Sequence, residues 1–434
     1  MAATKPKKLT LRAYQVGFGD CFLLTFHYPK FDRHVLVDFG STGQPKSAGD
    51  KLMLRVAKDI ASECGGKLHA VIATHRHRDH ISGFSTQGGK NASGTIIAQC
   101  DPDVVVQPWT EHPDADPKTG KLKPSNKNEF AFTSALQDMH ELSAAVLVEA
   151  DRRKSVLGPR LHQQLTFLGE DNLTNASAVK NLMEMGRGKN KQGKNKKAQY
   201  VHYGSKSGLE SVLPGIKTIV LGPPTLAQSE EIRTMRSKDE DEFWHFQAMA
   251  GNFVSKRNSK TFRGAATYAA SSMPPATRWF IERMKGIRGE QMLSIMRALD
   301  KVMNNTSLIL LFQIGKKKLL FPGDAQIENW SYALSKAKDK KLLADVGLYK
   351  VGHHGSLNAT PKTLWNLFKN RSTKAKNGRL QTVVSTMAGK HGTPPKTEVP
   401  RQPLVAALKK ESDFFTTQDL KGAKNIRKDF VITF

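Results

Sequence analysis

The stretch Thr74-His75-Arg76-His77-Arg78-Asp79-His80 contains three histidines and an aspartate within six positions. It directly follows residues 68–74, an apolar run typical of a buried strand. His75 and His77 are two residues apart, so on an extended backbone their side chains project to the same side. Asp79 and His80 follow where the chain turns and can face a neighbouring position. Imidazole and carboxylate together suit zinc, manganese or iron, so the stretch predicts a metal site.

The surrounding segments predict an α/β fold. A strand pattern, a helical pattern over residues 49–63, the strand over 68–74 and then a polar loop follow one another. This order is typical of α/β proteins, whose functional side chains lie at strand ends. Further strands are expected at 9–16, 21–26, 34–39, 217–221, 307–314, 318–321, 346–351, 381–385 and 430–434, and helices at 360–369 and 402–411.

The composition excludes several classes of protein. Hydrophobic residues make up 38% of the 434 residues, too many for a wholly disordered chain. No apolar run approaches the ~20 residues that a membrane span needs, so no membrane association is expected. The three cysteines form no disulfide framework, and no secretory signal is visible at the start. We therefore expect a cytoplasmic protein; its oligomeric state is open.

The charge balance is strongly basic. The chain has 67 Lys and Arg against 39 Asp and Glu, a formal net charge of +28. Such a surface attracts nucleic acid, but it is also a common way of keeping a protein soluble. Residues 186–197 are basic and lack apolar side chains, which predicts a mobile connector rather than a finger that contacts polyanions.

Three further motifs accompany the histidine stretch. They are Leu36-Val-Asp-Phe-Gly40, Leu320-Phe-Pro-Gly-Asp324 and Tyr349-Lys-Val-Gly-His-His-Gly-Ser356. With HxHxDH at 75–80, the chain resembles the metallo-β-lactamase superfamily, nearest the branch that contains the hydrolase domain of ComEC-type DNA-uptake proteins. Val16-Gly-Phe-Gly-Asp20 resembles the opening hairpin of that branch, with Asp20 expected to be a turn residue.

The resemblance implies an αββα sandwich with a long, mainly helical insertion. It covers residues 1–110, 215–225 and 304–434. We expect 1–112 and 304–434 to form the two halves of the sandwich. Residues 113–303 would form the insertion, with one core strand near 215–225.

The resemblance also implies two divalent ions, Zn²⁺ or Mn²⁺, with a single ion as the alternative. The implied metal ligands are His75, His77, Asp79, His80, Asp324, which would bridge the two ions, and one of His353 and His354. The other of those two histidines would contact substrate or orient a ligand. Asp79, His353 and His354 are the candidate catalytic residues. Candidates for supporting the ligands or contacting substrate are Asp38, Ser356, His391 and His112.

One position departs from the superfamily pattern. A further metal-binding histidine usually stands between HxHxDH and the Gly-Asp motif, but the matching segment, 219–224, has Gly222 there. The first ion would then have His75, His77 and Asp324 with water, which is still a competent arrangement. The first ion could also have lower occupancy. His112 is the candidate that would replace the missing histidine.

These features predict a metal-dependent hydrolase that uses a metal-bound hydroxide. Phosphodiester bonds of nucleic acid are the expected substrate, because of the net charge and the resemblance to a DNA-uptake branch. Two alternatives stay open: a small-molecule ester or phosphodiester hydrolase with a helical lid, and a nucleic-acid-binding protein with a degenerate metal site.

Overall fold

The computed structural model describes residues 4–49, 51–112, 146–148, 150–152, 154, 157–171, 175–225, 227–229, 293, 302–356, 360–390, 398–420 and 425–434. The chain divides into two compact units. The first comprises Met1–Thr133, Asn175–Ile232 and Met303–Phe434, and the second Ser134–Thr174 and Arg233–Val302.

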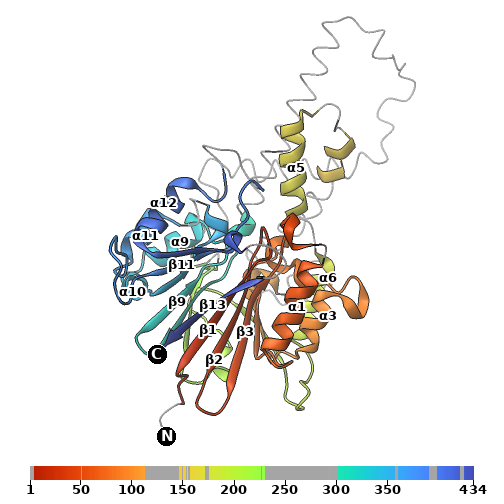
Figure 1. The fold of residues 1–434 in the computed structure, drawn as a ribbon. Helices are drawn as coiled ribbons and strands as arrows, with labels where there is room; N and C mark the ends of the chain where they lie inside the picture. Colours follow the sequence, from red (N-terminus) through yellow and green to blue (C-terminus); the bar gives the residue numbers. More distant parts are fainter. Residues whose placement is uncertain are drawn as a thin grey trace, which may run out of the picture. The chain divides into compact units, whose positions relative to one another are not determined.

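The first unit contains a seven-stranded mixed sheet in the order β13-β1-β2-β3-β4-β5-β6 (Figure 1). Its strands are β1 (Lys8–Tyr14), β2 (Cys21–His27), β3 (Asp32–Phe39), β4 (Ala70–Ile72), β5 (Val104–Pro108), β6 (Lys197–Val201) and β13 (Arg427–Thr433). The strands from β3 to β6 pair in parallel, whereas β13, β1, β2 and β3 pair antiparallel. The carboxyl ends of β3 to β6 therefore lie at one edge.

A six-stranded mixed sheet in the same unit has the order β12-β11-β10-β9-β8-β7. Its strands are β7 (Lys217–Gly222), β8 (Ile309–Ile314), β9 (Lys317–Phe321), β10 (Leu348–Lys350), β11 (Gln381–Val384) and β12 (Asp413–Thr416). The strands from β9 to β12 pair in parallel, so the loops that follow β9 and β10 also lie at one edge.

Alternating side chains explain how the two sheets pack. In β2, Phe22 and Phe26 face the second sheet, while Leu23 faces the opposite way. Phe22 meets Phe321 with ring centroids 5.9 Å apart, and Phe26 meets Phe312 at 6.2 Å. One hydrophobic core therefore lies between the sheets.

Helices cover the outer faces of both sheets, which gives four layers: helix, sheet, sheet, helix (Figure 1). In α1, Leu52, Val56 and Ile60 recur every four residues and bury one face. The helices on the first sheet are α1 (Leu52–Glu63), α3 (Ser93–Gln99) and α6 (Ala176–Met185); those on the second are α9 (Ile327–Leu334), α10 (Ala337–Ala344), α11 (Lys362–Leu367) and α12 (Gln402–Glu411). The expected α/β class is confirmed.

Short helical turns complete the first unit. They are α2 (Arg78–Ile81) and the 3₁₀ turns η1 (Lys46–Ala48), η2 (Ser82–Phe84), η3 (Gly89–Asn91), η4 (Trp109–Glu111), η6 (Leu209–Ser211), η9 (His353–Gly355) and η11 (Thr417–Asp419). In the second unit the structure describes α5 (Pro159–Asp171), where Leu165 is buried. Among the described residues, no helix has the length and apolar character required to cross a membrane.

Residues 113–303, expected to form an insertion with one core strand, contribute further elements to the first unit. β7 lies at the position expected for a core strand, but α6 and β6 also belong to the first unit. Residues 186–197 form an ordered turn rather than the mobile connector that their composition predicts. Asp101 accepts a hydrogen bond from the Lys191 backbone (2.7 Å), and Asp103 accepts one from the Asn190 amide (2.6 Å). These two aspartates order a segment that has no apolar side chains of its own.

Candidate metal centre

The candidate ligands follow three strands that belong to two different sheets. Residues 75–80 follow β4 of the first sheet, whereas Asp324 follows β9 and His354 follows β10 of the second. The backbone N–H of Leu308 donates to the Thr74 carbonyl oxygen (2.9 Å), which joins the end of β4 to the start of β8. The site therefore forms only when the sheets pack together.

Gly323 allows the loop after β9 to approach the histidine stretch. Its φ of +55° lies in the left-handed region, and a Cβ there would lie 2.8 Å from Cβ of Thr74. Any larger residue would push this loop away. The Gly-Asp pair is therefore required by the close approach that brings Asp324 to the histidines.

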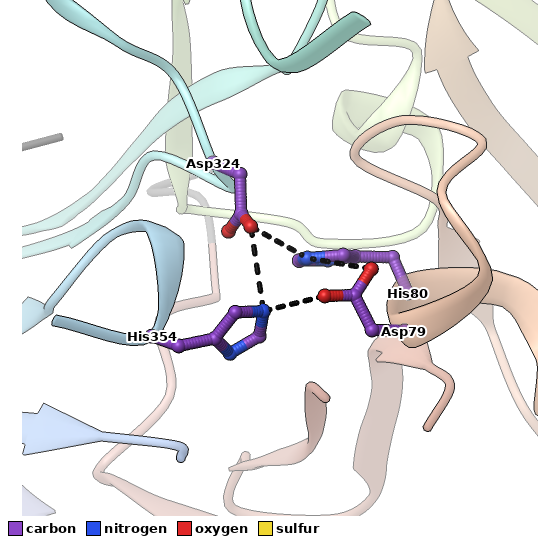
Figure 2. Close-up of side chains that lie close together, drawn as sticks. All are labelled: Asp79, His80, Asp324 and His354. Atoms are coloured by element: carbon purple, nitrogen blue, oxygen red, sulfur yellow. Dashed lines mark hydrogen bonds and ion pairs between the residues drawn. The ribbon is translucent and has the colours of Figure 1, made fainter. Parts of the chain in front are cut away.

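Four buried side chains meet at this point: Asp79, His80, Asp324 and His354 (Figure 2). His354 Nε2 lies 2.7 Å from Asp79 Oδ2 and 3.4 Å from Asp324 Oδ2. His80 Nε2 lies 3.1 Å from the same Asp324 oxygen. One ligand atom from each residue falls within a 4.8 Å range, so the four can surround a single cation.

A second group consists of His75, His77 and Asp79, also within 4.8 Å of one another. Asp79 belongs to both groups, whereas Asp324, the residue expected to bridge the two ions, belongs to the first group and not to the second. Among the described residues, His75 Nε2 and Asp79 Oδ1 have no hydrogen-bond partner, although both are buried. Unpaired buried polar atoms are costly unless a cation or proton binds them. The donor set therefore fits divalent metal ions.

Asp38 supports the histidine stretch through hydrogen bonds to Thr74 and a close contact with His80. Its carboxylate accepts hydrogen bonds from the backbone N–H and the hydroxyl of Thr74, both at 2.7 Å. Asp38 Oδ2 also lies 2.8 Å from His80 Nδ1. A carboxylate on one imidazole nitrogen orients the ring and leaves the other nitrogen for a metal, and here that nitrogen faces Asp324.

The two adjacent histidines have different positions. The His354 side chain is fully buried, and its Nδ1 lies 2.9 Å from the Ser385 carbonyl oxygen, so Nε2 points into the cluster. His353 is half-buried, and its backbone N–H donates to Asp324 Oδ1 (3.0 Å). Both residues have positive φ, +43° and +52°, a strained conformation often found at functional sites. The structure therefore places the His354 side chain, and not that of His353, among the ligands.

Of the three other candidates, two lie outside the groups of potential ligands and the third is not described. His112 is exposed, and its ring packs on Tyr200 with centroids 4.7 Å apart. It belongs to none of the His/Asp groups found among the described residues. Ser356 is half-buried at the end of η9, where its backbone N–H donates to the His353 carbonyl oxygen (2.8 Å). His391 lies outside the described residues.

Two buried charges beside the cluster were not among the site residues expected from the sequence. Asp20, expected to be a turn residue, is 0% exposed, and Lys350 is 2% exposed. Their side chains form an ion pair, and Lys350 Nζ also lies 3.5 Å from Asp324 Oδ1. The available signal was a lysine inside the apolar strand expected at 346–351, because a buried lysine needs an anionic partner.

The electrostatics of the cluster favour cations. Burial alone would raise the pKa of Asp324, but His80, His354 and Lys350 hold it well below its usual range. Burial would lower the pKa of His80, but Asp324 and three further carboxylates raise it well above the usual range. Burial lowers the pKa of His75, with His80 and His77 adding to the effect. The neighbouring carboxylates therefore favour positive charge at this point of the molecule.

Gly222 has no room for the histidine found in the superfamily. A Cβ there would lie 2.3 Å from Asn329 Oδ1 and 2.9 Å from Ile309 Cδ1. The Asn329 amide cannot move away freely, because its Nδ2 donates to the carbonyl oxygens of Asn305 (3.0 Å) and Ser307 (2.8 Å).

Gly222→Ala is therefore expected to destabilise the protein by about 1–3 kcal/mol through overpacking. Urea denaturation measures the loss. Gly378→Ala is a matched control for adding a methyl group, because nothing lies within 4 Å of its Cβ position; its positive φ of +75° adds backbone strain without a clash. Gly222→Ala should cost less stability in an Asn329→Ala background than in the native protein, and an equal cost in both backgrounds would contradict the clash.

No model of a known protein family matches the chain, and no curated protein matches it. The fold and the cluster themselves define the class: a four-layer α/β protein with buried histidines and carboxylates at the ends of strands from both sheets.

Proposed function

We propose that the chain is a metal-dependent hydrolase with the αββα sandwich of the metallo-β-lactamase superfamily. The observation that supports this most is the convergence of Asp79, His80, Asp324 and His354, all buried, from three strand ends in two sheets. A chance cluster of buried charges would be costly to fold, so their meeting favours a bound cation.

The residues suit two divalent ions, Zn²⁺ or Mn²⁺. His75, His77 and Asp79 would hold one, and Asp79, His80, Asp324 and His354 the other. Such ions lower the pKa of water toward about 7 and stabilise charge that develops on a phosphoryl oxygen. The three-residue position has fewer protein ligands, which leaves room there for water and substrate.

Each side chain has a separate task in this proposal. Asp324 would offer Oδ2 as a ligand, while the His353 backbone N–H holds its Oδ1. Asp79 belongs to both groups of potential ligands, and its Oδ1, which lacks a hydrogen-bond partner among the described residues, would accept a hydrogen bond from water. His353, half-buried beside the ligands, is the group we assign to the leaving oxygen of the substrate.

A phosphodiester of a nucleic acid is the substrate we favour. The net charge of +28 supports a polyanion. Arg187, Lys189, Lys191 and Lys194 are exposed on the ordered turn 186–197. That turn precedes β6 and the cluster follows β4. Both strands run parallel to β5, so the turn and the cluster lie at opposite edges of the sheet, and the turn adds only to the overall positive charge.

The substrate is tested by incubating the protein with single- and double-stranded DNA and RNA, with Mn²⁺ or Zn²⁺, beside a small chromogenic phosphodiester. We expect nucleic-acid cleavage that a chelator abolishes. Binding of the same nucleic acid should weaken by orders of magnitude between about 50 and 200 mM salt. Chelator-resistant cleavage would contradict the metal mechanism, and turnover of the small phosphodiester alone would favour a small-molecule hydrolase.

Metal removal is also expected to lower the thermal stability. The Asp79 and Asp324 carboxylates repel each other at the junction of the two sheets, and a bound metal ion would offset that repulsion. Binding to the folded state alone stabilises by about 2.7 kcal/mol at 100-fold excess over Kd. Differential scanning calorimetry with and without Zn²⁺ measures the difference. An equal midpoint in both conditions would argue against ligation by this cluster.

A further inference from the structure

A buried ion pair, Asp20–Lys350, lies next to the cluster. Lys350 is the last residue of β10, and Asp20 ends the turn that leads into β2. The Lys350 ammonium contacts the Asp20 carboxylate, the Gly323 carbonyl oxygen (3.2 Å) and Asp324 Oδ1 (3.5 Å). A single lysine therefore touches both the Gly-Asp turn and the partner aspartate.

Asp20 in turn contacts the remaining ligand segments. Its backbone N–H donates to the Asp79 carbonyl oxygen (2.9 Å). Its carboxylate oxygens lie 3.7 Å from His80 Nδ1 and 3.8 Å from His354 Nδ1. These are the nitrogens opposite the Nε2 atoms that face the cluster. Asp20 therefore lies on the outer side of both rings, where it influences the ligands without being one.

The Lys350 ammonium also accounts for the third group of potential ligands, Asp20, Asp38 and His80. The ammonium pairs with Asp20, so this group already contains its own cation. We therefore assign no ion to it.

Stability alone does not explain this pair. Removing two charges from water costs several kcal/mol per ion, and well-packed apolar residues are often at least as stabilising. The pair instead contributes to the orientation of the Asp324 carboxylate. Lys350 and the His353 backbone N–H both face Asp324 Oδ1, while Oδ2 faces His80 and His354.

We propose that Asp20 and Lys350 are positioning residues of the metal centre. They hold Asp324 so that its Oδ2 faces His80 and His354, and Asp20 places a negative charge near the Nδ1 atoms of both rings. This inference rests on the proposed function, because it assigns the pair to the same metal centre.

The test uses Lys350→Met, Asp20→Asn and the double variant in the full-length protein. Each single change leaves one buried charge without its partner, so both should be less stable than the native protein. The double variant removes both charges, so its urea midpoint should recover. Zn²⁺ affinity, measured by competition with a chromogenic chelator, should stay at least 10-fold weaker in all three. The visible spectrum of the Co²⁺-loaded protein should also change in the two variants that lack Lys350, because Asp324 Oδ1 loses one of its two fixing contacts.

Lys318→Met is the matched control. Lys318 is a buried lysine on β9 that pairs with Asp345 (3.3 Å) and the Leu342 carbonyl oxygen (3.0 Å), on elements other than the ligand loops. It should lose stability and keep native Zn²⁺ affinity. Native affinity and spectrum in the double variant would overturn the positioning role and leave the proposed function intact. Absence of stoichiometric metal binding in the native protein would overturn both.

Discussion

Asp324→Asn is expected to lower metal-dependent cleavage by at least about 10³-fold, a loss of roughly 4 kcal/mol of transition-state stabilisation. The carboxylate supplies the oxygen that faces both His80 Nε2 (3.1 Å) and His354 Nε2 (3.4 Å). An amide has nearly the same shape but no charge, so the change removes the ligand and preserves the packing. Initial cleavage rates and metal content by mass spectrometry measure the two effects.

Asp339→Asn is the matched control for this experiment. Asp339 is equally buried, at 2% exposed, and accepts a hydrogen bond from the Tyr203 hydroxyl (2.6 Å) on the outer face of the second sheet. Its cleavage rate should stay close to native. Native cleavage by Asp324→Asn would remove that carboxylate from the mechanism.

Phe312→Ala is expected to cost about 3–5 kcal/mol of the free energy of unfolding. Phe312 is 0% exposed between the two sheets, with ring centroids 6.2 Å from Phe26 and 5.9 Å from Phe321. Truncation leaves a cavity in the core that joins the sheets. Because each sheet supplies part of the cluster, we also expect weaker Zn²⁺ binding. Urea denaturation and the chelator competition measure both quantities.

Phe31→Ala provides the comparison, because Phe31 is 37% exposed and, within the described part of the chain, its ring stacks on Tyr28 and Arg33. It should lose far less stability and keep native Zn²⁺ affinity. Equal losses in the two variants would mean that the inter-sheet core is not the source of the effect.

The histidine stretch shows what local sequence can predict. His75 and His77 are two residues apart after an apolar strand, and this spacing predicts that their side chains project to one side; both belong to one group of potential ligands. Asp79, predicted to face a neighbouring position, belongs to that group as well. The strand and helix patterns likewise predict the α/β class. Both follow from short-range periodicity, which the backbone geometry imposes within a few residues.

Other features depended on contacts between distant segments. Composition predicts a mobile connector over 186–197, but Asp101 and Asp103 order that turn from another part of the chain. The choice between His353 and His354 likewise depended on the Ser385 carbonyl oxygen, which fixes the His354 ring. Neither interaction has a signal in the neighbouring sequence.

The sequence by itself determined the donor types, their grouping in short motifs and the alternation that buries both sheets. The tertiary structure decided which donors meet: Asp79 and His354 are 275 residues apart along the chain and 2.7 Å apart in space. It also decided that Asp20 and Lys350 lie behind them as a buried pair. The physical reason is that side-chain periodicity acts within one element, whereas the packing of two sheets sets which strand ends adjoin.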